Sequence, residues 1–273
     1  MLQIKTIESV NKIFDTPGSS PLLVFCDDFN FWVCKYDRFP IYLFNELIAS
    51  EFAKIWRIKV PETSLITVKK EHIPEHMIPR LQPRWFRKEC FGSLYIEGAK
   101  EIDYTTFSLF KDKKFRDRVR DKSDFLKIAL FDIWLSNEDR SHNNFNLLLH
   151  TSQDRFSFIY AIDHVAIFNS ANLNREPCII TEDDTILNTE LARLLFTNNT
   201  RTKQYIDELV RNFYICISEC EQLLPEILLK IPASWDLNIL DLKNQLNRSI
   251  FNPAWLKECE ITFRQYLKYF ILN

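Results

Sequence analysis

The chain has 273 residues, of which 46% are apolar and 26% are charged, a composition typical of a globular protein and not of a disordered one. Its 35 basic and 37 acidic side chains create no overall positive field, so we expect no nucleic-acid binding. No apolar run approaches the roughly 20 residues of a membrane span, and the first residues lack the apolar core of a signal peptide. We therefore expect a cytoplasmic protein without a membrane segment.

The seven cysteines are scattered and lie mostly within apolar runs, as reduced core thiols do, and they do not suggest a disulfide framework. Cys216 and Cys220 are one helical turn apart and could share a metal. Core packing is favoured, because neither a CxxC motif nor a nearby histidine accompanies them. The chain has only three glycines, against about 7% in average proteins, which excludes a phosphate loop of the GxGxxG type.

The first part of the chain predicts the order strand, strand, helix, strand. Residues 21–28 and 31–36 are two β-rich runs separated by a short turn, and they predict a hairpin. Residues 40–56 carry apolar side chains at helical spacing. Another strand is expected at 63–69, which completes an arrangement similar to the small lobe of a kinase.

Lys35 falls in the second of these strands and Glu46 in the helix. A kinase N-lobe pairs a strand lysine with a helix glutamate to position phosphates. The alternative is that both side chains are solvated, as isolated lysines and glutamates usually are. The apolar neighbours Val33, Cys34 and Tyr36 favour the phosphate role for Lys35.

The segment 73–83 is punctuated by prolines, and residues 90–96 predict a further strand. The region that comprises both is expected to carry the lobe connection. A helix at 124–136, capped by Ser123 or Asp124, leads into a polar loop. Beyond residue 163 the pattern predicts helices at 188–196, 202–223, 225–231, 238–251 and 253–271, with breaks at Pro225, Pro232 and Pro253.

The polar loop after the 124–136 helix is the most informative segment. Asp139 and Asn144 lie five residues apart in it, and a later apolar run at 156–162 ends on Asp163. Phosphoryl transfer needs an acceptor for the proton of the attacking hydroxyl, and oxygen ligands for Mg²⁺ on the nucleotide phosphates. We interpret Asp139 as the base, and Asn144 and Asp163 as metal ligands. The alternative is ordinary turn chemistry, in which Asn, Asp and Ser side chains cap their own backbone.

Together these residues resemble the HipA-like kinase family over most of residues 16–168. The shared features, in chain order, are a Gly-Ser segment opening into PLLV (Gly18 to Pro21), the strand lysine (Lys35), NEL (Asn45 to Leu47), VPE (Val60 to Glu62), FGS (Phe91 to Ser93), FDIW (Phe131 to Trp134), the NxDR loop (Asn137 to Asn144) and AIDH (Ala161 to His164). The resemblance implies an α+β, bilobal, protein-kinase-like or phosphatidylinositol-kinase-like fold. Its β-rich N-lobe would cover about 1–97 and its mostly helical C-lobe about 98–273.

The resemblance also implies ATP and Mg²⁺ as cofactors. Lys35 would then contact the phosphates, Asp139 would be the catalytic aspartate, and Asn144 and Asp163 would hold the metal. Arg140 corresponds to the arginine that follows the aspartate in such loops. It would either stabilise developing charge or brace the loop by pairing with a carboxylate.

Gly18, Ser19 and Ser20 form the only glycine-containing loop ahead of the predicted hairpin. Its hydroxyl and N–H groups are expected to contact the phosphates with Lys35. Related kinases phosphorylate a serine in the corresponding loop, which makes Ser19 or Ser20 a candidate for inhibitory self-phosphorylation. The alternative is an ordinary turn.

Some positions depart from the family pattern. The histidine often found two residues after the aspartate is replaced by Ser141, with His142 next, and His164 follows the metal aspartate. A side-chain hydrogen bond from His164 to Asp163 and a plain packing role are both open. Toxin-type HipA kinases are longer and carry an additional N-terminal subdomain, so a toxin role and an antitoxin partner are not expected here.

The expected activity is that of an ATP-dependent protein serine/threonine kinase. One alternative keeps the fold with a small-molecule or lipid-headgroup acceptor. A second is a nucleotide-binding pseudokinase that acts as an interaction module, although all four core groups are present in the chain. A third is a helical adaptor with accidental motifs.

Overall fold

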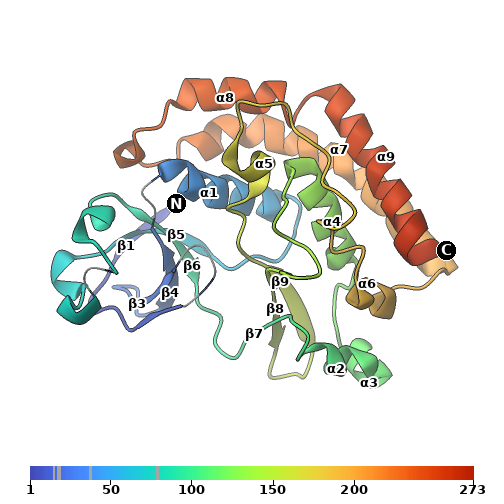
Figure 1. The fold of residues 1–273 in the computed structure, drawn as a ribbon, viewed down its shortest axis with the longest axis horizontal. Helices are drawn as coiled ribbons and strands as arrows, with labels where there is room; N and C mark the ends of the chain where they lie inside the picture. Colours follow the sequence, from blue (N-terminus) through green and yellow to red (C-terminus); the bar gives the residue numbers. More distant parts are fainter. Residues whose placement is uncertain (15, 17–19, 37–38, 78–79) are drawn as a thin grey trace.

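The computed structural model describes residues 1–14, 16, 20–36, 39–77 and 80–273. A mixed sheet forms the first lobe (Figure 1). Its order is β1-β5-β6-β4-β3-β2, with β1 parallel to β5 and the other neighbours antiparallel. The strands are β1 (Leu2–Lys5), β2 (Lys12–Ile13), β3 (Leu22–Phe25), β4 (Phe31–Lys35), β5 (Thr63–Thr67) and β6 (Cys90–Leu94). The predicted hairpin is confirmed as the β3–β4 pair.

The predicted helix is α1 (Pro40–Ile55), which begins with proline at its first turn, where the missing N–H removes no helical hydrogen bond. Its buried residues, among them Leu47 and Phe52, pack in one core cluster with Leu65 and Phe91 of the sheet. The opposite sheet face packs in a second cluster, which includes Trp32, Cys34 and Phe86. Successive side chains of a strand point to opposite faces, so Cys34 in this second cluster leaves Lys35 on the α1 side.

Within the region expected to carry the lobe connection, the proline-punctuated segment 73–83 does not itself connect the lobes. That region contains three short 3₁₀ turns, η1 (Lys70–His72), η2 (Glu75–Met77) and η3 (Pro83–Phe86), and it joins β5 to β6 within one sheet. The chain leaves this sheet after β6 and passes through residues 95–99 to β7 (Lys100–Glu101) (Figure 1). Prolines disfavour regular helix and ladder hydrogen bonding wherever they occur, so their presence marked an irregular segment and not a lobe boundary.

The second lobe contains a three-stranded sheet of β7, β8 (Leu147–Thr151) and β9 (Ser157–Ala161). Beside it lies α4 (Ser123–Leu135), which is buried around most of its circumference. The predicted cap of this helix is wrong. The N-cap position is Lys122, without a side-chain cap, and Asp124 instead accepts a hydrogen bond from Lys127 Nζ at 2.8 Å. Two short helices, α2 (Phe107–Lys111) and α3 (Lys113–Arg116), precede α4.

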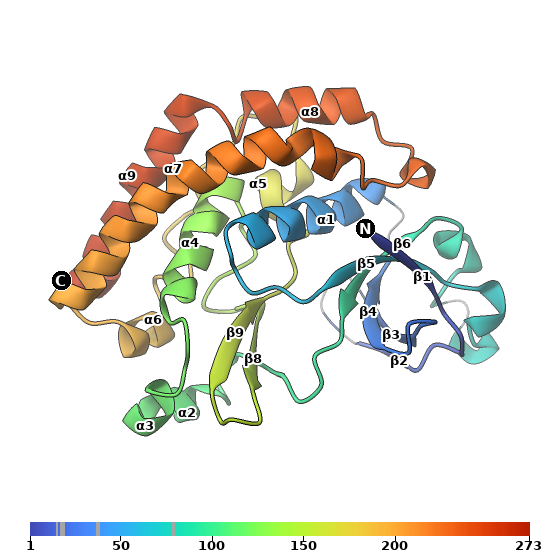
Figure 2. The same cartoon turned by 180° about the vertical axis from the view of Figure 1, so that it is seen from behind.

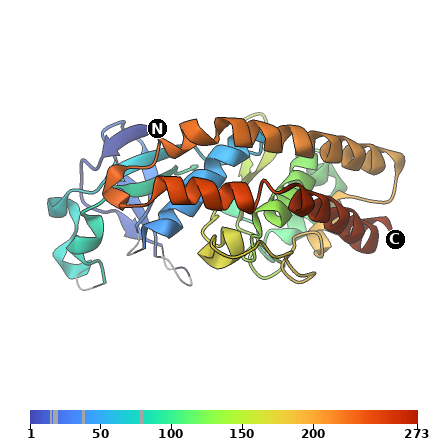
Figure 3. The ribbon, with the colours of Figure 1, turned by 90° about the horizontal axis from the view of Figure 1, so that it is seen from above.

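Further helices complete the second lobe (Figures 2 and 3). They are α6 (Glu190–Leu195), α7 (Thr200–Leu228), α8 (Ile239–Arg248) and α9 (Pro253–Leu267), the last followed by a π-helical turn (Lys268–Leu272). The predicted break at Pro225 is wrong, because α7 continues through it. Leu224, Ile227 and Leu228 are buried there, and their packing outweighs the one backbone hydrogen bond that proline removes. The end of α7 reaches over the N-lobe (Figure 1).

The chain between β9 and α6 is mostly irregular. It contains α5 (Ile167–Ala171), in which Phe168, Asn169 and Ser170 have positive φ values of 60°, 53° and 56°. All seven cysteines are free thiols. Within the described ranges, no helix is both long and apolar enough to span a bilayer.

Candidate active site

Three charged side chains from distant parts of the sequence meet between the lobes. Lys35, the last residue of β4, places Nζ 2.5 Å from Glu46 Oε1 on α1 and 3.0 Å from Asp163 Oδ1, just after β9. The side chain of Glu46 is only 4% exposed and that of Lys35 only 13% exposed. Neither is solvated as an isolated surface charge would be, and the sequence-predicted residues Lys35, Glu46 and Asp163 form one cluster.

The cluster holds two carboxylates and one ammonium, and its titration reflects that imbalance. Burial raises the pKa of Glu46 to about 7, because the opposing charge of Lys35 only partly compensates for the lost hydration. Burial also disfavours ionised Asp163, but the charge and hydrogen bond of Lys35 outweigh it and hold the Asp163 pKa at about 2. Burial alone would lower the pKa of Lys35, whereas Asp163 and Glu46 together raise it. Lys35 is therefore a cation and Asp163 an anion at neutral pH.

Helix α1 also fixes the backbone that follows Asp163. The His164 N–H donates to Glu46 Oε1 at 3.1 Å, and Asn45 Nδ2 donates to the Val165 carbonyl at 2.8 Å. Asp163 itself has a φ of 56°, a left-handed conformation that aspartate tolerates better than most residues. Adjacent residues of one helix thus hold the segment that presents the expected metal ligand.

The side chain of His164 is 2% exposed, and its ring packs edge-on against Phe131 with the ring centroids 6.2 Å apart. Its Nε2 has no hydrogen-bond partner among the residues that the structure describes. Burial and the nearby Arg140 and Lys35 charges lower the pKa of His164, so the ring is neutral. Of the two roles left open for His164, this geometry favours packing, with the contact to the cluster made by its backbone.

Asp139 is oriented by two asparagines of the loop between α4 and β8. Asn144 Nδ2 donates to Asp139 Oδ1 at 3.0 Å, and Asn146 Nδ2 donates to Asp139 Oδ2 at 3.2 Å and to the Asp139 carbonyl at 3.0 Å. Asn146 adopts a φ of 46°, and its carbonyl accepts a hydrogen bond from the Ile162 N–H at 3.0 Å. Because Asp163 follows Ile162, the same asparagine connects the Asp139 loop to the Asp163 strand end.

Arg140 is fully buried and faces the inside of the loop. Its Nε lies 2.9 Å from Asp132 Oδ2 on α4, and its guanidinium donates to the carbonyls of Phe145 and Asn146. Asn137 Nδ2 donates to the other Asp132 oxygen at 2.8 Å. Burial raises the pKa of Asp132, partly offset by Arg140. Of the two roles expected for Arg140, this position supports bracing, since a side chain without solvent exposure does not reach a substrate.

The oxygen ligands expected for a divalent cation fit Mg²⁺ chemically. Asp163 offers a carboxylate held ionised by Lys35, and Asn144, whose Nδ2 donates to Asp139, has an amide oxygen as the second ligand. In the described ranges no group of three or more His, Cys, Asp or Glu could hold a metal. Two oxygen ligands suit Mg²⁺, which usually keeps several waters and takes further oxygens from nucleotide phosphates.

The expected phosphate loop joins β2 to β3. Gly18 and Ser19 lie outside the described residues. Ser20 is half-buried directly ahead of Pro21 and β3. The assignments of Gly18, Ser19 and Ser20 to phosphate contact, and of either serine to self-phosphorylation, stay predictions.

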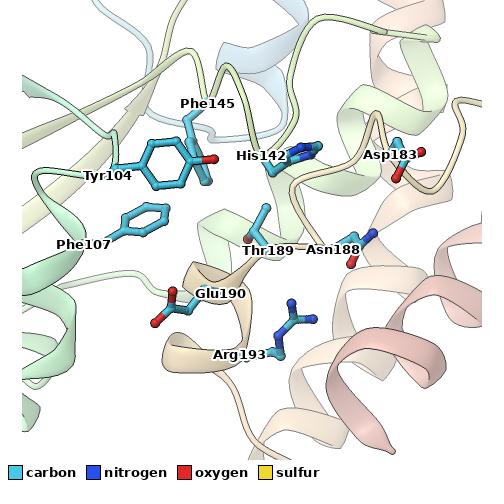
Figure 4. A pocket seen from close by; sticks show the side chains of 9 residues that line it. All are labelled: Tyr104, Phe107, His142, Phe145, Asp183, Asn188, Thr189, Glu190 and Arg193. Atoms are coloured by element: carbon cyan, nitrogen blue, oxygen red, sulfur yellow. The ribbon is translucent and has the colours of Figure 1, made fainter.

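A cavity of about 370 Å³ lies beside the loop between α4 and β8 (Figure 4). His142 from the loop lines it, and Figure 4 shows Tyr104, Phe107 and Phe145 gathered on one side, with Glu190 and Arg193 of α6 across from them. Phe107 and Phe145 pack edge-on with their centroids 5.3 Å apart. His142 and Phe145, which line the cavity, belong to the segment that follows Asp139.

The sequence was also compared with protein families. The sequence matches the model of the HipA-like kinase over residues 7–253. The chain belongs to the HipA-like kinase family. The family match includes parts of both lobes of this HipA-like kinase and every site residue named above. A search among curated proteins finds no significant match.

The solved structure of one kinase, CtkA, supports the same fold. The proinflammatory kinase CtkA of Helicobacter pylori superposes on this HipA-like kinase with a TM-score of 0.55 at 16% identity, covering 98% of this chain and 99% of CtkA. HipA of Shewanella oneidensis MR-1, solved with HipB and operator DNA, has a TM-score of 0.49 at 14% identity, and the match covers 93% of this chain and 68% of that HipA chain. The Golgi casein kinase with Mn/ADP bound has a TM-score of 0.47 at 10% identity, and the match covers 93% of this chain and 74% of the Golgi kinase chain. The bilobal kinase-like α+β fold expected from the sequence is confirmed.

Proposed function

We propose that this protein is an ATP- and Mg²⁺-dependent phosphotransferase whose acceptor is a serine or threonine hydroxyl of a protein. The observation that carries the proposal is the contact of Lys35 Nζ with both Glu46 and Asp163. A helical adaptor has no need to place an ammonium between two buried carboxylates, which is costly unless the charges serve a purpose. A kinase needs that cation on phosphates and that carboxylate on a metal.

Each of the site residues has a defined role in this reaction. Lys35 binds the phosphates, and Glu46 keeps its ammonium in place from α1. Asp163 and Asn144 hold Mg²⁺, which when bound neutralises charge on the phosphates. Asp139 accepts the proton of the attacking hydroxyl.

Asn146 supports that role, because its amide donates to the Asp139 carboxylate and backbone and thus fixes the direction in which the base faces. Arg140 and Asp132 hold the loop from beneath. The base and the metal ligands are therefore oriented before any substrate arrives, which is the main contribution that a protein makes to phosphoryl transfer.

The acceptor approaches from the side of the cavity that His142 lines. Tyr104 is 68% exposed there, so the cavity opens on the surface, as an extended protein segment requires. A small-molecule or lipid-headgroup acceptor is the alternative on the same site, and a pseudokinase would bind nucleotide without transferring phosphate.

The test is incubation with γ-labelled ATP and Mg²⁺, followed by intact-mass analysis of the protein and of added protein and small-molecule acceptors. Label on serine or threonine of a protein supports the proposal. Label only on a small molecule would replace the acceptor class. Nucleotide binding without any transfer, in a preparation with native stability, would make the protein a pseudokinase.

A further inference from the structure

A second cavity lies on the N-lobe, on the side of the sheet that does not face α1. Its volume is about 320 Å³, and it is formed where β5 ends and the 3₁₀ turns η1 and η3 follow, among the cyan turns of Figure 1. Its lining residues are Val68, Lys70, Pro83, Arg84, Phe86 and Arg87.

The floor of this cavity is apolar and is part of the outer core of the sheet. Val68 is 3% exposed and Phe86 is 7% exposed, and both belong to the cluster with Trp32 and Cys34. The ring of Phe86 lies 4.7 Å from that of Tyr36, which follows Lys35 in the chain. The cavity is therefore separated from the Lys35 cluster by the sheet itself.

The rim of the cavity carries only positive charge. Lys70, Arg84 and Arg87 are exposed, and within the described chain none of their side chains makes a hydrogen bond or ion pair. No carboxylate lines the cavity. Glu71 and Glu75 lie on the same β5–β6 connection but are not part of the lining.

Three like charges around one hollow repel each other and focus a positive potential into it. Lys35, Lys230 and Arg140, by contrast, each pair with a carboxylate. A set of unpaired cations over an apolar floor is complementary to an anion that carries an apolar group. Guanidinium groups favour phosphate in particular, because their planar N–H donors match its oxygens in pairs.

We propose that this N-lobe cavity is a binding site for a phosphomonoester attached to an aromatic or other apolar group. The phosphate lies among Lys70, Arg84 and Arg87, and the apolar group rests on Phe86 and Val68. A volume of about 320 Å³ is at the small end of ligand pockets, which span roughly 300–1,000 Å³, so it suits one ring or side chain with its phosphate. This site is separate from the proposed phosphotransfer site and does not depend on it.

The test is calorimetric titration of the full chain with phenyl phosphate, with inorganic phosphate and benzoate as comparison probes. All titrations contain a saturating Mg²⁺–ATP analogue, which keeps the probe out of the Lys35 site. The site variant is Lys70→Gln/Arg84→Gln/Arg87→Gln. The matched control is Lys203→Gln/Arg211→Gln/Arg248→Gln, which removes the same charge from three exposed positions of α7 and α8.

We expect one phenyl phosphate per chain, an affinity at least about tenfold weaker in the site variant, and an unchanged affinity in the control variant. Inorganic phosphate and benzoate should each bind more weakly, because each lacks one half of the ligand. Absence of saturable binding, or equal loss in both variants, would overturn the proposal.

Two further probes identify the source of the ligand. A phosphotyrosine peptide that binds more tightly than phenyl phosphate, and loses affinity in the site variant, assigns the site to a modified protein. Tighter binding of phenyl phosphate assigns it to a small molecule. A DNA duplex is the second of these probes. If the duplex binds through the same three residues while phenyl phosphate does not bind, the ligand is a nucleic acid and the proposal is refuted. If the protein binds no nucleotide at all, the same titrations in a Lys35→Met background still test the N-lobe cavity.

Discussion

Lys230, two residues beyond the end of α7, donates to Glu51 Oε2 on α1 at 2.5 Å. Glu51 is 7% exposed and also accepts from Lys54 Nζ at 2.7 Å. Burial raises the pKa of Glu51, but the hydrogen bonds from Lys230 and Lys54 outweigh it and lower the pKa overall. The C-terminal helices are thus tied to the helix that carries Glu46.

The same segment reaches the N-lobe sheet. Trp235 Nε1 donates to the Glu89 carbonyl at 2.7 Å, and Ser234 Oγ donates to the Glu89 carboxylate, just ahead of β6. Trp235 is 1% exposed. Residues 230–235 therefore contact both α1 and the residue ahead of β6.

The first prediction concerns Lys230→Met. Losing the contact from Lys230 should loosen α1 and so disturb the Lys35–Glu46 pair, which lowers kcat/KM for ATP by about five- to tenfold, the usual size of a coupling between two sites. Steady-state kinetics measure it. Lys230→Arg should retain most of the activity, because it keeps a cation at Glu51.

Lys54→Met is the matched control, since it removes the other ammonium from the same carboxylate but lies on α1 itself. Lys54→Met should lower the free energy of unfolding about as much as Lys230→Met does, but without the loss in kcat/KM. Equal kinetic losses in Lys54→Met and Lys230→Met would show that only the charge of Glu51 matters and not the tie between the lobes.

The second prediction separates the two roles of Arg140. Arg140→Gln should lower the free energy of unfolding by about 3–5 kcal/mol, because Asp132 is left as an uncompensated buried charge, and Asp132→Asn should reduce that loss when added to it. Denaturant unfolding of the single and double variants measures both. A variant with native stability and a large fall in kcat would instead make Arg140 a group that acts on the substrate.

The third prediction concerns pH. The Glu46 pKa of about 7 lies above its usual value of 4.5, so the folded chain binds more protons than the unfolded chain between these pH values. The contribution of Glu46 to stability is present below pH 4.5 and is lost as pH rises through 7, a change on the order of 3 kcal/mol.

Glu46→Gln should remove this slope, and the difference between wild type and variant isolates it from His164. The lowered pKa of His164 acts in the opposite direction, because it favours folding as pH rises through the usual histidine range. Asp163, with a pKa of about 2, contributes only at more acidic pH. Identical pH profiles for wild type and Glu46→Gln would contradict the assigned titration.

The fourth prediction concerns Asp139→Asn. Turnover should fall by about 10² to 10⁴, the usual effect of losing a general base, while the affinity for Mg²⁺–ATP changes little, because Asp139 acts on the acceptor hydroxyl. Single-turnover kinetics and calorimetry measure the two quantities. A variant that turns over at the wild-type rate would exclude Asp139 as the base.

Much of the site follows from local patterns. The strand containing Lys35, the helix containing Glu46 and the two strands ahead of Asp163 each have a clear hydrophobic period, and a period fixes which face a residue occupies. Asn146 was missed, because an asparagine next to an apolar strand resembles any turn residue. Its role depends on a positive φ and on a hydrogen bond from Ile162, and neither has a signature in sequence.

Contacts between distant segments also could not be predicted from the sequence. Lys230 and Glu51 are 179 positions apart, and each alone resembles a solvated charge. Strand β1 was missed because its parallel partner β5 lies far along the chain and its pattern is short. The continuation of α7 through Pro225 depends on tertiary packing, which overrides local propensity.

The central claim is that Lys35 and Asp163 form a site for a nucleotide with Mg²⁺. Calorimetric titration with a non-hydrolysable ATP analogue, with and without Mg²⁺, tests it most directly in wild type, Lys35→Met and Asp163→Ala. We predict that wild type binds much more tightly with Mg²⁺, that Asp163→Ala loses this dependence on the metal, and that Lys35→Met binds weakly in both conditions. Equal affinities of the three proteins, or wild-type binding that ignores Mg²⁺, would contradict the account.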